Sequence, residues 1–135
     1  MATKKPSSEV TVGIKYDDKK LDFSLLSPYA MIKLTQVLTY GKFKYDANNW
    51  RKGIVYTRLI AATFRHLYLW LAGADIDKDS ATEEHEGLSH LACAMCSIMF
   101  LLEFSQTSQH LDDRFKFKEG HLNEMTNLMV SKEAE

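Results

Sequence analysis

The chain has little cysteine, little proline and no long hydrophobic run, and each shortage excludes a class of protein. Only two of its 135 residues are cysteine and two are proline. A disulfide scaffold is therefore excluded, and most of the chain is free to be helical. The longest apolar runs, IAATF and LACAMCSIMFLL, are too short for a membrane span, and no apolar segment follows the lysines of MATKKPSSEV as in a secretory signal. We therefore expect a protein of the reducing cytoplasm.

A strong charge of either sign is also missing. The formal net charge is −1 at pH 7, with 26% charged and 45% hydrophobic residues, as in an ordinary soluble globular protein. Such a chain has no overall field to attract it to nucleic acid or to a membrane surface, so neither is expected as a partner. Its length predicts one domain with a real core.

Hydrophobic periodicity predicts an all-α protein. A helix should begin at Ser27-Pro28, with serine as the N-cap and proline in the first turn, and end near Gly41. The segments from about Tyr56 to Leu71 and from Gly87 to Phe104 are apolar almost all round, as in helices inside a bundle. A last amphipathic helix is predicted within residues 121–130, and no strong strand pair is predicted.

These elements predict a compact bundle of about four to five helices with an irregular N-terminal arm. We expect a flexible N-terminus over residues 1–12, an all-α core over 13–105, and a C-terminal helical extension and tail over 106–135. Because the bundle is small and its helices are apolar all round, a homodimer or higher homo-oligomer is expected.

Residues 41–58 are basic and aromatic. Five cationic side chains face a single acid, Asp46, and two large aromatic residues, Tyr45 and Trp50, lie among them. The cations are Lys42, Lys44, Arg51, Lys52 and Arg58. Such a run is often only a solvated face, but aromatic rings between cations are also typical of a site that stacks a base and holds phosphates.

Residues 65–90 contain a loop with a large excess of acid. Its six carboxylates are opposed only by Lys78 and His85, so cations from a metal or from the rest of the chain should compensate them. The acids are Asp75, Asp77, Asp79, Glu83, Glu84 and Glu86. The glutamates have a competing role as partners of a helix N-terminus, whereas the first two aspartates follow a helix C-terminus, where acids are unfavourable. A calcium loop is excluded, because Ser80 stands where that loop requires glycine.

His66 and His90 flank this acidic loop from the two most apolar helices. Each is readily explained as a core histidine, but the loop between them should bring the two helix ends together, which favours a site. Cys93 and Cys96 lie mid-helix among apolar residues without a second cysteine pair. We interpret them as core residues rather than as a zinc or redox motif.

Four segments, taken in order, resemble a known family. They are KYDDKKLDFSLLSP, VLTYGKFKYDANNWRKGI, RLIAATFRHLYLWLAG and GLSHLACAMCSIMFLLEF. Over about residues 13–105 the chain resembles the phage domain called dATP/dGTP diphosphohydrolase, N-terminal type, a relative of the MazG-like all-α nucleotide pyrophosphohydrolases. The resemblance implies a phage nucleotide-pool enzyme of the host cytoplasm, which hydrolyses a purine deoxynucleoside triphosphate to monophosphate and pyrophosphate with Mg²⁺ or Mn²⁺. A non-catalytic member that binds a nucleotide, a nucleotide signal or a host protein stays open as the alternative.

The resemblance also implies roles for particular residues. His66, His90 and Asp77 are expected to be catalytic. The expected metal ligands are Asp75, Asp77 and Glu86, with His66 and His90 as ligands or proton carriers. The expected substrate-binding residues are Lys44, Tyr45, Asn49, Trp50, Arg51, Arg65, Asp18 and Lys20.

Overall fold

The computed structural model describes residues 11–130, and the regular structure of this part of the chain is almost entirely helical. The helices are α1 (Pro28–Tyr45), α2 (Tyr56–Leu71), α3 (His90–Thr107) and α4 (Glu119–Leu128), and the strands are β1 (Ile76–Asp77) and β2 (Leu88–Ser89). The all-α prediction is confirmed. Most of the predicted flexible N-terminus and the last residues of the tail lie outside the described residues. Within the described range, no helix is both long enough and apolar enough to cross a membrane.

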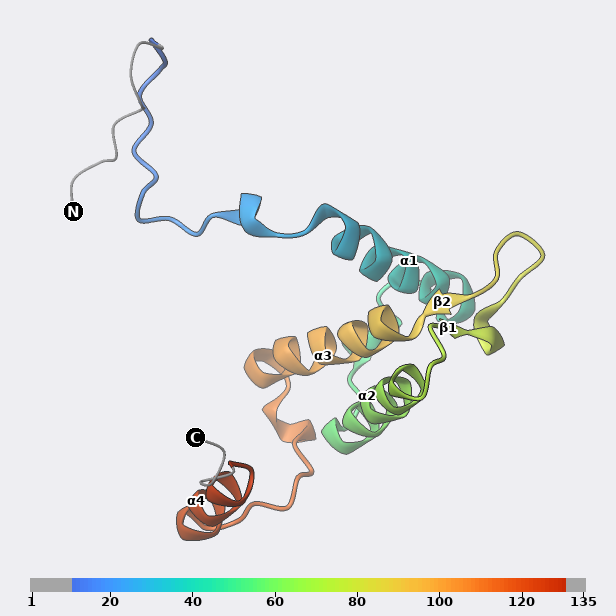
Figure 1. Ribbon diagram of the computed structural model, residues 1–135, viewed down its shortest axis with the longest axis vertical. Coiled ribbons are helices and arrows are strands. Elements are labelled where there is room, and N and C mark those ends of the chain that lie inside the picture. Colours follow the sequence, from blue (N-terminus) through green and yellow to red (C-terminus); the bar gives the residue numbers. More distant parts are fainter. Residues whose placement is uncertain (1–10, 131–135) are drawn as a thin grey trace.

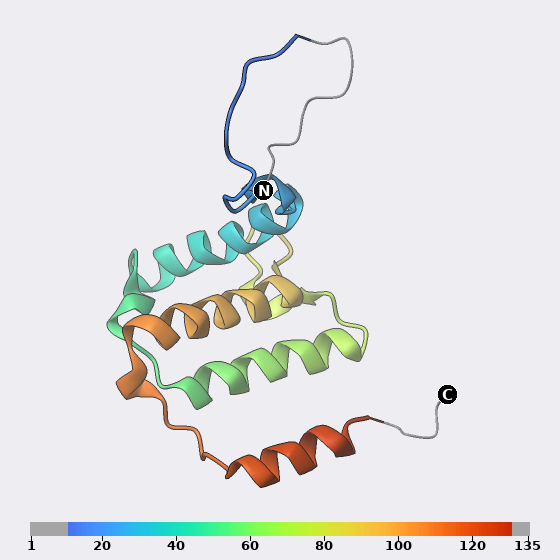
Figure 2. The same cartoon turned by 90° about the vertical axis from the view of Figure 1, so that its left-hand side faces the viewer.

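Three of the helices form one layer. α3 lies between α1 and α2, and the short β1–β2 pair sits at the end of this layer where α2 finishes and α3 starts (Figures 1 and 2). The arm before α1, residues 11–27, extends away from the layer, and α4 lies apart from it beyond α2. The layer of α1, α3 and α2 is therefore the part of the fold that positions a site.

α1 is longer than its sequence predicts. Its start is as expected, because the Ser27 hydroxyl accepts a hydrogen bond from the Ala30 N–H at 3.1 Å. The predicted end near Gly41 is wrong, since the helix continues to Tyr45 and ends at Asp46, whose φ is 80°. One glycine inside a helix costs only about 1 kcal/mol, which neighbouring turns can offset. The first part of the basic segment is therefore helical.

The core lies where α2 starts and α3 ends. Tyr56, Leu59 and Phe104 are buried together, and the Tyr56 hydroxyl donates to the Phe104 carbonyl oxygen at 2.8 Å. The chain after α3 returns to this point, where an Asp113 carboxylate oxygen accepts a hydrogen bond from the Thr57 N–H at 2.9 Å. The Thr57 hydroxyl, which also donates to this carboxylate, lowers the pKa of Asp113, and the N–H bond lowers it further. The charge lies where the α2 dipole favours an anion. Residues beyond α3 thus help to hold the start of α2.

The β1–β2 pair was not predicted. It is antiparallel, with Ile76 opposite Ser89 and Asp77 opposite Leu88. The hydroxyl of Ser80 reinforces it by donating to the Asp77 carbonyl oxygen at 2.6 Å and accepting from the Leu88 N–H at 2.8 Å. Strands of two residues are too short to show alternating hydrophobicity, which explains why the sequence did not indicate them. The pair fixes Asp77 relative to the start of α3.

Candidate functional site

A groove of about 1170 Å³ opens between the C-terminal half of α1, the turn at Asn49–Lys52, α2 and α3. Five cationic residues line it, as do three acids. The cations are Lys42, Lys44, Arg51, Arg58 and Arg65, and the acids are Asp46, Asp77 and Asp79. The basic segment and the acidic loop, far apart in sequence, therefore line the same groove, and its cations outnumber its acids.

Trp50 and Arg51 form a fixed part of the groove wall. The Trp50 ring stacks on Phe100, with ring centroids 4.4 Å apart and an interplanar angle of 14°. The guanidinium carbon of Arg51 lies 4.4 Å from the centroid of the Trp50 ring, and its Nη1 lies 2.7 Å from Oε2 of Glu103. The indole predicted to stack on a base is thus already packed against two side chains, while Arg51 is held in position at the groove.

Lys44, Tyr45 and Asn49 also line the groove, at the end of α1 and in the turn that follows it. Tyr45 is 54% exposed, and the ammonium nitrogen of Lys44 lies 5.0 Å from the centroid of its ring. This exposure leaves the Tyr45 ring accessible to a ligand, in contrast to that of Trp50.

His66 lines the groove and meets His90, which is buried. Their Nδ1 atoms are 2.8 Å apart, so the predicted approach of the two helix ends is confirmed. At this distance one nitrogen donates a hydrogen bond and the other accepts it, and both cannot carry a proton there. Burial lowers the pKa of His66, and the nearby His90 and Arg65 lower it further, while Asp77 opposes them.

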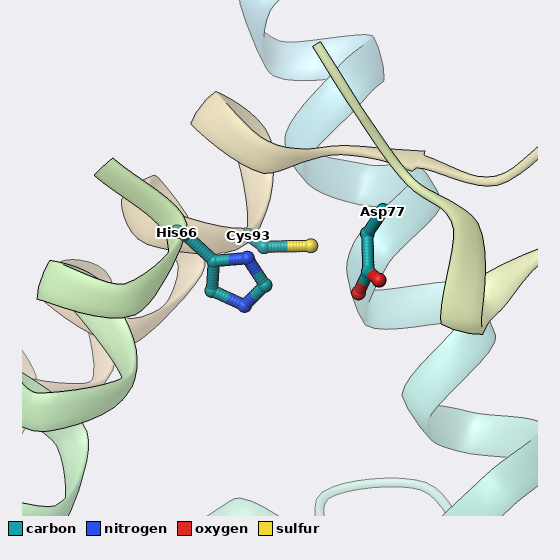
Figure 3. Close-up of side chains that lie close together, drawn as sticks. All are labelled: His66, Asp77 and Cys93. Atoms are coloured by element: carbon teal, nitrogen blue, oxygen red, sulfur yellow. The ribbon is translucent and has the colours of Figure 1, made fainter. Parts of the chain in front are cut away.

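His66, Asp77 and Cys93 form a cluster with three kinds of donor atom (Figure 3). One nitrogen, one carboxylate oxygen and the Sγ atom all lie within 4.8 Å of one another. Cys93 and Cys96 are both buried, as expected for core residues, and burial, with the Asp77 charge, raises the pKa of Cys93 to about 11. Sequence reasoning missed Cys93 in this role, although its spacing of three from His90 places both on one face of α3.

Some predicted residues lie elsewhere. Asp75 and Glu86 are exposed and, among the described residues, belong neither to the groove lining nor to the cluster. Asp18 and Lys20 are exposed on the arm, which extends away from the layer of helices (Figure 1). Conversely, Arg58 and Asp79 line the groove but were not selected from the sequence, where only their membership of the basic segment and the acidic loop marked them.

Comparison with known proteins identifies the fold's family. Residues 11–114 match the family model described as "dATP/dGTP diphosphohydrolase, N-terminal". The chain belongs to this family. A protein of Salmonella phage PMBT28 named "dATP/dGTP diphosphohydrolase" is 31% identical over 102 residues, which are 76% of this chain and 33% of the relative. The chain thus spans about a third of the length of that relative, and no solved structure matches it. The resemblance noted from the sequence is confirmed.

The region shared with the dATP/dGTP diphosphohydrolase N-terminal family contains the whole groove. It includes α1, α2, α3 and the strand pair, and it extends to Arg114, just past the Asp113 carboxylate that holds the start of α2. α4 follows this region. The groove and the His66–Asp77–Cys93 cluster are therefore parts of the family domain itself.

His66 should make the stability of this family domain depend on pH. Because the folded-state pKa of His66 is lowered from 6.5, the unfolded chain binds more protons as pH falls below that value. The stabilisation is fully present above 6.5 and is lost as pH falls through the lowered pKa. Thermal melting of metal-free protein should therefore show a lower Tm at about pH 5.5 than at about pH 7.5. The His66→Gln variant should show a smaller change, and an equal change in both proteins would contradict the assignment to His66.

Proposed function

We propose that this chain acts in the metal-dependent hydrolysis of a purine deoxynucleoside triphosphate to monophosphate and pyrophosphate, in the nucleotide pool of a phage-infected cell's cytoplasm. The family description and the name of the phage relative support a deoxynucleoside triphosphate as substrate. The observation that carries the proposal is one groove that combines five cations with a cluster of histidine, aspartate and cysteine.

The cations suit a triphosphate. Lys44 and Arg65 line the groove, and Arg51 is held in it by Glu103 and by the Trp50 ring. A guanidinium presents several N–H donors in a plane that matches two phosphate oxygens, so a held arginine loses little freedom when it binds them. These side chains would neutralise the charge that develops on the phosphates as the bond between the α-phosphate and the β-phosphate breaks.

The acids of the groove suit a divalent cation that accompanies the phosphates. Mg²⁺ and Mn²⁺ prefer oxygen ligands, and Mg²⁺ is usually bound by one or two carboxylates together with substrate phosphates. Asp77 and Asp79 place two carboxylates in the groove lining and fit this requirement. When bound, the ion supplies charge neutralisation and orients the triphosphate. We therefore propose Mg²⁺ or Mn²⁺ as the activating ion.

The histidine pair suits proton transfer. Hydrolysis adds a water oxygen to phosphorus, breaks the bond between the α-phosphate and the β-phosphate, and releases a proton from the water. His66, whose pKa is lowered, is neutral near pH 7 and accepts such a proton, while His90 holds its ring through the Nδ1 contact of 2.8 Å. Asp77 beside it stabilises the resulting imidazolium.

The base would lie on the α1 side of the groove. A volume of about 1170 Å³ is ample for a nucleotide, since small-molecule sites measure about 300 to 1,000 Å³. The accessible ring of Tyr45 can stack on a purine, and the Asn49 side chain supplies both a hydrogen-bond donor and an acceptor.

A panel of nucleotides tests the proposal. Each dNTP and NTP is incubated with the protein and Mg²⁺ or Mn²⁺, and products are separated by chromatography. We expect dATP or dGTP to yield monophosphate and pyrophosphate, and the His66→Ala/His90→Ala double variant to be inactive. If no nucleotide is consumed, or if the double variant is as active as the original chain, the enzyme proposal fails. A nucleotide that binds by calorimetry without being cleaved would instead support the binding-protein alternative.

We also propose that the chain works as a homo-oligomer. Large apolar side chains on the arm are highly exposed, including Ile14 at 78%, Leu21 at 85% and Leu25 at 82%. A single copy buries only a small core, so a second copy is the natural cover for this surface and would receive Asp18 and Lys20 with the arm. Light scattering should give a mass above that of one chain, and Leu21→Glu/Leu25→Glu should lower it. A monomeric mass for the original chain would contradict the proposal.

A further inference from the structure

Three side chains from three separate elements converge at the groove. His66 comes from α2, Asp77 from β1 and Cys93 from α3, and their donor atoms lie within 4.8 Å of one another (Figure 3). Each position is set by the fold rather than by neighbours in sequence. The cluster is therefore a property of the assembled layer of helices.

The donor atoms decide which ion the cluster suits. One imidazole nitrogen, one carboxylate oxygen and one thiol sulfur are typical ligands of Zn²⁺, whereas Mg²⁺ takes oxygen ligands almost exclusively. Zinc–ligand distances of about 2.0 to 2.3 Å place tetrahedral ligands roughly 3.3 to 3.8 Å apart. The donor atoms lie within 4.8 Å of one another, so binding needs them to approach by about 1.5 Å at most.

The surroundings hold two of the three ligands in place. His90 contacts the His66 ring, with Nδ1 atoms 2.8 Å apart, and hydrogen bonds from neighbours of this kind commonly orient metal-binding histidines. An Asp77 carboxylate oxygen accepts from the Asp79 N–H at 3.1 Å, and the Asp77 carbonyl accepts from Ser80. These contacts reduce the side-chain freedom that ion binding must restrict.

We propose that, in the chain without nucleotide, His66, Asp77 and Cys93 bind one Zn²⁺ or chemically similar ion per chain. This state is distinct from the one in which His66 accepts a proton and Asp77 serves the Mg²⁺ or Mn²⁺ of the phosphates, because the ion would occupy the same donor atoms. Three protein ligands leave one tetrahedral position open, which is the arrangement of catalytic rather than structural zinc sites. All three residues line the groove. Binding of this ion does not rest on the proposed function, because it is tested without nucleotide.

Cobalt spectroscopy tests the ion site without any substrate. The full chain is freed of metal with a chelator and titrated with Co²⁺, which replaces Zn²⁺ and gives an intense near-ultraviolet thiolate-to-cobalt absorption only when sulfur is a ligand. We expect this absorption to saturate at one Co²⁺ per chain, to disappear when Zn²⁺ is added, and to persist in excess Mg²⁺.

Variants assign the ligands. Cys93→Ser should abolish the absorption, and Cys96→Ser is the matched control, because Cys96 is buried on the same helix but lies outside the cluster. Cys93→His guards against misfolding, since it should still bind Co²⁺, with visible absorption but without the sulfur band. All variants are checked for helical content by circular dichroism.

Several results would overturn the ion proposal. They are the absence of Co²⁺ binding, binding without a sulfur band, equal loss of the band in both serine variants, and displacement by Mg²⁺. The band can be present in a protein that cleaves no nucleotide; this would support the ion site while the proposed function fails. Nucleotide cleavage by a chain without the band would do the reverse.

Discussion

Replacing Asp77 by asparagine is expected to reduce triphosphate hydrolysis by about a hundredfold or more. The change removes one negative charge from the cluster of His66, Asp77 and Cys93 while keeping the size of the side chain. Asparagine retains an oxygen that can accept the Asp79 N–H, so the short turn after β1 should persist. The loss should appear mainly in kcat, measured by pyrophosphate release at saturating nucleotide and metal.

Asp79→Asn is the control for this substitution. Asp79 lines the same groove and carries the same charge, but it is exposed and lies outside the cluster. Its replacement should change kcat by less than about tenfold. Any larger effect should appear in the concentration of Mg²⁺ that is needed for half-maximal activity. Equal losses in the two variants would mean that the acids act only through their summed charge, and full activity of Asp77→Asn would remove Asp77 from the mechanism.

Replacing Gly87 by alanine is expected to destabilise the fold by roughly 2 to 4 kcal/mol. Gly87 has a φ of 131°, and an added Cβ would lie 2.3 Å from the Asp77 carbonyl oxygen and 2.8 Å from Cγ2 of Ile76. Relief of this clash requires β1 and β2 to separate, which moves Asp77 away from His66 and Cys93. Urea denaturation followed by circular dichroism measures the loss, and the Co²⁺ titration should show weaker binding.

Two other glycines separate the causes of this effect. Gly73 also has a positive φ, 107°, but no heavy atom of the described chain lies within 4 Å of its added Cβ, so Gly73→Ala should cost only about 1 kcal/mol of backbone strain. Gly41 lies inside α1 with similarly open surroundings, and Gly41→Ala should stabilise by about 0.5 to 1 kcal/mol. If Gly87→Ala lowers the free energy of unfolding no more than Gly73→Ala does, the close approach of the two strands is not a determinant of stability.

The helices α2 and α3 were predictable because each buries residues over more than one turn. The bounds of α2, Tyr56–Leu71, agree with the hydrophobic pattern. The end of α1 was not predictable from Gly41, since the intrinsic preference of one residue is small beside the packing of the whole helix. The two-residue strands have no periodicity to detect, and their pairing depends on contacts between distant parts of the chain.

The candidate site was predictable in outline but not in detail. The approach of His66 and His90 follows from the loop that joins their helices, and the structure brings the rings into contact. The strand pair decides which acid of the loop belongs to the candidate site. It fixes Asp77 beside the start of α3, whereas Asp75 and Glu86 are exposed. Cys93 was interpreted as a core residue because its neighbours are apolar, and only the approach of His66 and Asp77 distinguishes it from Cys96.

The stacking of Trp50 gives the groove a built-in fluorescent reporter. The chain has two tryptophans, and of these Trp50 lines the groove while Trp70 is 42% exposed near the end of α2. In a Trp70→Phe protein all indole emission would come from Trp50, whose ring contacts both Phe100 and the guanidinium of Arg51. A phosphate bound to this guanidinium would change the electric field at the indole and alter the emission, so nucleotide occupancy can be followed in real time without a label.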